Sequence, residues 1–107
     1  MKVMKGTTPT FTLTLPEDID LDKATTVYVT LSYMSSGREI FTKRTEELVI
    51  DKNVIYVFLT QEETLSFPSS AQLQVNWVYD DAGVNKRASS EIVNIEFANN
   101  LLNKVVE

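Results

Sequence analysis

Polar and hydrophobic side chains alternate along most of this chain. In Thr10–Leu15, phenylalanine and leucine take every second position, and threonine takes the positions between them. The same period of two residues returns in segments 25–33 and 71–79. Because neighbouring side chains of a β-strand point to opposite faces of a sheet, this period predicts strands that each bury one face.

Shorter segments complete the predicted set of strands. They cover residues 38–44, 48–50 and 54–59, and a final long strand ends near Phe97 with Val93, Ile95 and Phe97 on its buried face. Turn-forming residues separate the segments: Pro16, Ser35-Ser36-Gly37, Asp51-Lys52-Asn53 and Asp80-Asp81-Ala82-Gly83. About seven strands at this spacing predict an all-β sandwich, built as one domain over residues 10–98.

A single helical turn is predicted between two of these strands, over residues 61–65. It begins with a capping box, in which the Thr60 hydroxyl accepts the Glu63 amide and the Glu63 carboxylate accepts the Thr60 amide. No long segment shows the 3.6-residue period of a helix. The helical content is therefore expected to be limited to this turn.

Both chain ends are predicted to lie outside the sandwich. Residues 1–9 form a short arm, because Gly6-Thr7-Thr8-Pro9 resists regular structure. Residues 99–107 form an apolar tail, which is expected to dock against another surface.

The sequence turns polar within its first six residues, which predicts no signal peptide and synthesis in the cytoplasm. No apolar stretch reaches the length that spans a membrane, so no membrane partner is expected.

Composition argues against most small enzymes and metal sites. The chain has no histidine and no cysteine, the usual neutral-pH base and the usual zinc ligands. With a net charge of -5 it lacks the clustered basic residues that bind a phosphate backbone, so no nucleic acid is expected. The basic pairs Lys43-Arg44 and Lys86-Arg87 are interpreted as solvated strand ends. We expect no catalysis and no cofactor.

The remaining polar motifs have ordinary structural interpretations. Asp18, Asp20 and Asp22 alternate like a calcium loop, but Lys23 and Val29 stand where such a loop needs glycine and a bidentate glutamate. Glu62-Glu63 falls in the capping box and Asp80-Asp81 in a turn. Ile19 and Leu21 are expected to hold the acidic loop against the core.

Two features of the strand over residues 71–79 leave alternatives open. Trp77 is favoured as a core residue over a ligand-stacking one. On the opposite face of this strand, Gln72, Gln74 and Asn76 could bind sugar hydroxyls or face water.

The segment Val54-Ile55-Tyr56-Val57-Phe58-Leu59 is apolar on both faces. Ile55, Val57 and Leu59 suit the core, which leaves Val54, Tyr56 and Phe58 on the other face. Such a row is rarely left in water. Either the chain's own tail or a neighbouring subunit covers it, and both remain open. The predicted protein interface therefore comprises Val54, Tyr56 and Phe58 together with the tail residues Leu101, Leu102, Val105 and Val106.

The order of these segments resembles small virion proteins of tailed phages and prophages of Gram-positive bacteria, similar to the N-terminal domain of baseplate upper proteins. The resemblance spans nearly the whole chain. It is carried by Thr10–Leu15, the Pro16-Glu17-Asp18-Ile19-Asp20-Leu21 loop, Val27–Leu31, Leu59–Phe67, Leu73-Gln74-Val75-Asn76-Trp77, the Asp81-Ala82-Gly83 turn and Leu101–Val106.

The resemblance implies an immunoglobulin-like sandwich that catalyses nothing and assembles with copies of itself and with other virion proteins. The expected function is that of a structural component of the tail, baseplate or head-tail region, located in the virion. The alternative is a carbohydrate- or protein-binding module that recognises a host surface ligand. Such a module is expected to cluster aromatic side chains in its loops, and the loops of this chain are poor in them.

Overall fold

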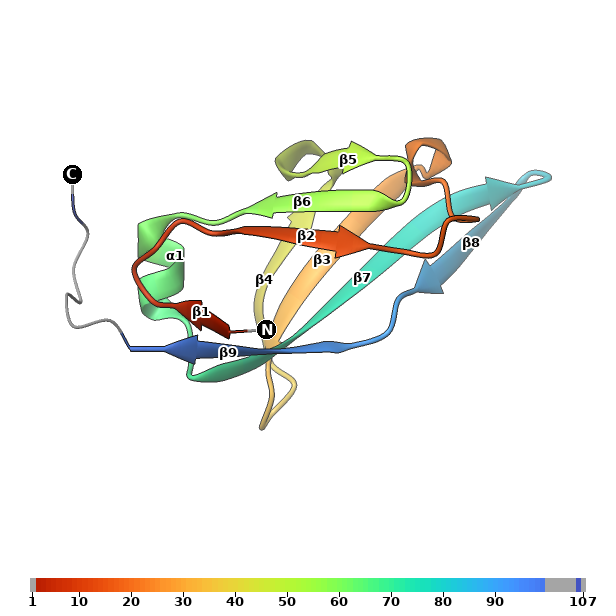
Figure 1. Ribbon diagram of the computed structural model, residues 1–107. Helices are drawn as coiled ribbons and strands as arrows, with labels where there is room; N and C mark the ends of the chain where they lie inside the picture. The colour runs from red at the N-terminus through yellow and green to blue at the C-terminus, as the bar shows by residue number, and fades with distance from the viewer. Residues whose placement is uncertain (1, 100–105, 107) are drawn as a thin grey trace.

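The computed structural model describes residues 2–99 and Val106. Within residues 2–99 the chain forms nine strands, one short helix and two 3-10 turns (Figure 1). The helix α1 is Gln61–Ser66, and the 3-10 turns are Leu21–Lys23 and Thr45–Glu47. The strands are β1 (Lys2–Met4), β2 (Thr10–Thr14), β3 (Thr26–Tyr33), β4 (Glu39–Arg44), β5 (Val49–Asp51), β6 (Val54–Phe58), β7 (Ser70–Asp81), β8 (Val84–Ser89) and β9 (Val93–Ala98).

These strands form two sheets that face each other across one core (Figure 1). The smaller sheet has the order β2-β6-β5. The larger has the order β1-β9-β7-β3-β4, and β8 pairs with the second half of β7. The ladder between β1 and β9 is parallel, and the other strand pairs are antiparallel. The predicted all-β, sandwich-like architecture is confirmed, and α1 forms where the helical turn is predicted. The residues described contain nine strands where about seven are predicted, and two 3-10 turns that the sequence analysis does not predict.

The alternating pattern explains which side chains fill the core. Every second residue of β2 and β6 is buried between the sheets, and so is every second residue of β3 up to Leu31 and of β7 up to Trp77. The residues between them are exposed or half-buried, and Tyr33 and Tyr79, which continue the period of two, are half-buried. Leu21 is also buried and Ile19 packs against the core, so the acidic loop is anchored as predicted. The largest fully buried apolar side chains are Phe11, Val27, Val29, Leu31, Ile55, Val57, Leu73 and Ile95.

The predicted final strand is interrupted. The Ser90 amide donates to the Val75 carbonyl at 2.8 Å, and the Ser90 hydroxyl accepts the Val75 amide at 2.9 Å. A side chain thus takes the place of a backbone acceptor, and the chain leaves the ladder before β9 begins. Val93, just past this break, is 40% exposed, so its predicted place in the core is wrong. Ile95 and Phe97 are buried as predicted.

The N-terminal arm is more regular than predicted. Its residues Lys2–Met4 form β1, which pairs with β9, and Val3 is buried. The Thr64 hydroxyl of α1 accepts the Gly6 amide at 2.9 Å and donates to the Thr7 carbonyl at 2.8 Å. Pairing with β9 and contact with Thr64 supply the order that the local sequence of the arm lacks.

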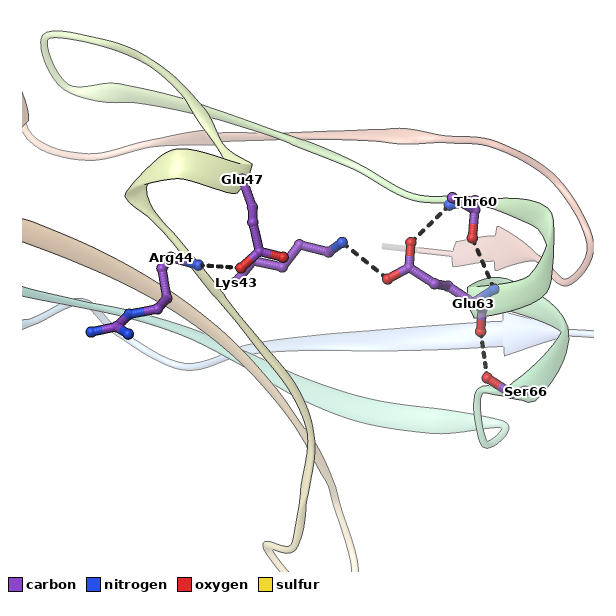
Figure 2. Close-up of polar contacts among 6 residues, drawn as sticks. All are labelled: Lys43, Arg44, Glu47, Thr60, Glu63 and Ser66. Carbon is purple, nitrogen blue, oxygen red and sulfur yellow. Dashed lines mark hydrogen bonds and ion pairs between the residues drawn. The ribbon is translucent and has the colours of Figure 1, made fainter.

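Helix α1 begins with the predicted capping box, and Figure 2 shows that the box is joined to the larger sheet. The Glu63 amide donates to the Thr60 hydroxyl at 3.2 Å, and the Thr60 amide donates to the Glu63 carboxylate at 3.0 Å. The same carboxylate pairs with the Lys43 ammonium of β4 at 3.0 Å. Because α1 follows β6, this ion pair connects the two sheets.

Glu63→Gln is expected to lower stability near neutral pH by up to about 1 kcal/mol, the upper range for an ion pair near the protein surface. Burial alone would raise the pKa of Glu63, but the Thr60 amide and the Lys43 ammonium together lower it below the ordinary value of a glutamate. Because the pKa of Glu63 is lower in the folded state, its carboxylate stabilises that state at pH values above the ordinary pKa of a carboxyl group. This stabilisation is lost as the pH falls through the pKa of the folded state. Urea unfolding of the parent and the variant should therefore differ near pH 7 and converge in acid. The exposed Glu62→Gln serves as the charge-matched control, and an equal effect of both substitutions would contradict the role of the Lys43 contact.

Candidate functional site

The outer side of the smaller sheet carries an apolar surface. Along β6, Ile55 and Val57 are fully buried, whereas Phe58 is 52% exposed on the opposite side. Val49 of β5 lies directly across from Tyr56 and is 50% exposed. We call Val49, Val54, Tyr56 and Phe58 the outer apolar face. The structure thus places the three predicted residues of β6 on one surface and adds Val49, which sequence reasoning missed.

Threonines border this face on one side. Thr10, Thr12 and Thr14 of β2 are exposed and lie opposite Phe58, Tyr56 and Val54. On the other side, Asp51 lies opposite Val54. The resulting surface is a short apolar strip flanked by hydroxyl groups, with an acidic residue at one corner. A flat strip of this kind can pack against another sheet face but offers no reactive group.

The predicted contribution of the tail is only partly visible. Leu101, Leu102 and Val105 lie outside the described residues. Val106 is exposed, and its amide and carbonyl bond to the Gln61 side chain at 2.8 and 2.9 Å. Gln61 begins α1, close in sequence to Phe58. Val106 is thus held at the start of α1, the helix that follows β6.

The acidic motifs have structural roles in the described part of the chain. The Asp20 carboxylate accepts the Asp22 amide at 3.1 Å and caps the 3-10 turn. Asp81 pairs with Lys86 at 2.6 Å. Trp77 is buried, as the core interpretation predicts. Residues 2–99 and 106 hold no group of three or more acidic side chains that could bind a metal ion.

The side chains of the two basic pairs make specific contacts, and one of them is largely shielded from solvent. The Lys43 side chain is only 13% exposed beside Glu63, because the ion pair across the sheets holds it there. The Arg44 guanidinium donates to the Tyr28 hydroxyl at 3.3 Å, and this contact raises the pKa of Arg44. Arg87 donates from two nitrogens to the Asn76 side-chain oxygen, at 3.2 and 3.0 Å. The prediction of a solvated side chain is therefore wrong for Lys43, whereas Arg44, Lys86 and Arg87 are exposed as predicted.

These arginine contacts border a polar hollow on the outer side of the larger sheet. It has a volume of about 370 Å³ and is lined by Tyr28, Thr30, Thr42, Asn76, Val78 and Arg87. Sequence reasoning did not bring these residues together. The predicted turn at residues 80–83 fixes the register between the two strands that it joins. In this register Asn76 lies opposite Ser89, and Arg87 is only two residues further along the strand, so the sequence could have placed Arg87 close to Asn76.

A larger and more apolar groove opens between the sheets. It has a volume of about 540 Å³ and lies between β2 and the break that separates β8 from β9. Its lining includes Leu13 and Leu15 from the smaller sheet and Leu73, Val75, Trp77 and Val93 from the larger. The displaced backbone after Ser90 leaves this side of the core open, which also accounts for the exposure of Val93.

Comparison with models of known protein families gives no match, and none of the curated proteins compared with this chain matches it. Among the residues that the structure describes, no helix has the length and apolar character needed to cross a membrane.

Proposed function

We propose that this protein is a structural component of a phage or prophage particle and works by assembling with copies of itself and with other virion proteins. The outer apolar face carries this proposal, since Phe58 and Val49 are each half exposed beside Tyr56. Burying a large apolar side chain contributes roughly 1.5–3 kcal/mol. Three or four such residues supply several kcal/mol before the entropy of association is subtracted.

The proposed fold is immunoglobulin-like, and the strand order supports this assignment. The smaller sheet, β2-β6-β5, corresponds to strands B, E and D of that fold, and β9-β7-β3-β4 corresponds to G, F, C and C′. Strand β1 pairs in parallel with β9, the position of an A′ strand. The resemblance to small virion proteins implies the same fold, so topology and sequence support one proposal.

Two observations test the two parts of the proposal. Genes for virion components are expected on both sides of the gene for this protein, and neighbours of a metabolic pathway would count against a role in a particle. For assembly, the parent chain is expected to sediment as an oligomer at micromolar concentration. Tyr56→Asp/Phe58→Asp should sediment as a folded monomer, with circular dichroism to check the fold. A monomeric parent, or equal oligomers of both chains, would refute assembly through this face.

The polar hollow on the larger sheet favours a second function, recognition of a saccharide ligand. Tyr28, Thr30 and Thr42 present hydroxyl groups there, and Arg87 is held in place by Asn76. Hydroxyl and guanidinium groups suit a polar or anionic sugar. Saccharide binding by the parent that is lost in Arg87→Ala would support this function over assembly.

A further inference from the structure

Strand β2 has a free edge. Its residues Pro9 and Leu15 bond to β6 through the Leu59 amide and the Asn53 carbonyl, at 3.3 and 2.8 Å. In an antiparallel ladder every second residue makes such bonds, so Phe11 and Leu13 also face β6. The amides and carbonyls of Thr10, Thr12 and Thr14 therefore point away from β6. Among the strands formed by residues 2–99, none lies on that side of β2.

The apolar groove lies directly along this edge. Its lining includes Thr12, Leu13 and Thr14 of β2 and the next two residues, Leu15 and Pro16. A strand added beside β2 would stand about 4.8 Å from it and send every second side chain toward the groove. The smaller sheet would then gain a fourth strand, and the groove would be filled by that strand's inward side chains.

The outer apolar face needs such an additional contact to hold two copies together. Three strands at about 4.8 Å spacing and about 17 Å long present roughly 250 Å². Stable interfaces bury about 800 Å² on each partner. A pairing strand with apolar side chains in the groove would supply a large part of the difference.

The tail is the segment of this chain best suited to the groove. Residues 99–107 extend to about 30 Å, longer than β2. In a strand, Leu101 and Val105 would share one face, and Leu102 and Val106 the other. One pair would then enter the groove, and the other would lie beside the threonines of β2.

In its own chain, the tail begins and ends at the other end of the molecule. The Ala98 carbonyl accepts the Lys5 amide next to the arm that Thr64 holds, and Val106 bonds to Gln61. The groove lies instead beside Thr12–Pro16. Because the tail and the groove lie at opposite ends of one chain, a second copy is the better source of the strand. The two exposed hydrogen bonds between Val106 and Gln61 cost little to break when the tail pairs with another copy.

We propose that the tail of one copy pairs with the free edge of β2 in a second copy and places one of these two apolar pairs in its groove. This proposal rests on the proposed self-assembly and names the segment that completes the contact. It also explains why an apolar chain end coexists with an open apolar groove in one molecule. The contact is between different surfaces, so repeated copies form a ring or a filament.

Trp77 provides the readout, because it is the only tryptophan of the chain and lines the groove. A synthetic peptide of residues 99–107 is titrated into the full-length protein at a concentration where the protein is monomeric. The peptide should cause a saturable change in Trp77 fluorescence.

Thr12→Pro removes an amide that faces the free edge and spares the ladder to β6, so it should weaken peptide binding at least about tenfold. Thr12→Val keeps the amide and should bind normally.

A second pair of variants tests the groove from the opposite sheet. Val93→Glu places a carboxylate in the groove and should abolish the fluorescence change. Val84→Glu, at the exposed tip of the β7–β8 hairpin, should leave it intact. Circular dichroism checks that each variant folds.

No fluorescence change in the parent, or equal binding by Thr12→Pro and Thr12→Val, would overturn the proposal. Sedimentation separates it from the proposed function: association lost in Tyr56→Asp/Phe58→Asp but kept in Thr12→Pro would support the outer face and overturn the groove contact. The reverse pattern would support the groove contact and contradict the role of the outer apolar face.

Discussion

Ile55→Ala is expected to lower the free energy of unfolding by about 2–5 kcal/mol, the range for truncating a fully buried isoleucine. Ile55 has no exposed surface and packs between the two sheets from the middle of β6. A domain of this size has a total stability of roughly 5–15 kcal/mol, so the variant is expected to be close to its unfolding threshold. Urea unfolding followed by Trp77 fluorescence measures the change.

Tyr56→Ala provides the matched control on the same strand. Its side chain points to the outer apolar face and is only half-buried, so the loss should be below about 1 kcal/mol. Self-association should weaken instead. If Tyr56→Ala proved as destabilising as Ile55→Ala, Tyr56 would be part of the fold and unavailable as an interface residue.

Thr64→Val is expected to cost about 2–4 kcal/mol, although it exchanges side chains of nearly equal volume. Thr64 is completely buried, and its hydroxyl serves both the Gly6 amide and the Thr7 carbonyl. Valine would leave that donor and that acceptor without a partner, and each buried unsatisfied group costs about 1–3 kcal/mol.

Thr64→Ser keeps the hydroxyl and should retain most of the stability. Thermal unfolding of the two variants gives the comparison. Hydrogen exchange should also become faster in β1 of Thr64→Val, since the arm is held by this residue and by β9. Equal stability of Thr64→Val and the parent would show that the arm is fixed by its strand pairing alone.

Much of this fold could be predicted because local pattern and tertiary packing agree. The alternation in β2, β3 and β7 matches their buried positions, and the Thr60–Glu63 capping box forms where the sequence places it. These features depend on neighbours in sequence. The period of two also predicts which side of β6 faces outward.

The features that could not be predicted depend on contacts between distant residues. Residues Lys2–Met4 of the arm form strand β1 because they pair with β9, and the Thr64 hydroxyl bonds to the arm at Thr7. The break after Ser89 depends on one hydroxyl of Ser90, which replaces a backbone acceptor for Val75. The same break exposes Val93 and opens the groove. Val49 joins the outer apolar face through its register with Tyr56, which a three-residue strand does not reveal in the sequence.

Two separate surfaces therefore carry the functional account, and the outer apolar face is the central one. Assembly through this face requires that Val49, exposed in a single copy, becomes covered when copies associate. The chain contains no cysteine, so a single introduced thiol reports its own environment. Val49→Cys changes the side chain little in size and leaves Tyr56 and Phe58 in place.

The most direct test is the rate at which a maleimide probe labels Val49→Cys as the protein concentration rises. Val84→Cys is the matched control, because Val84 is 57% exposed and lies on the distant β7–β8 hairpin. We predict that labelling of Val49→Cys slows with increasing concentration while labelling of Val84→Cys does not change. Equal and constant labelling rates for both variants, up to high micromolar concentration, would contradict assembly through the outer apolar face.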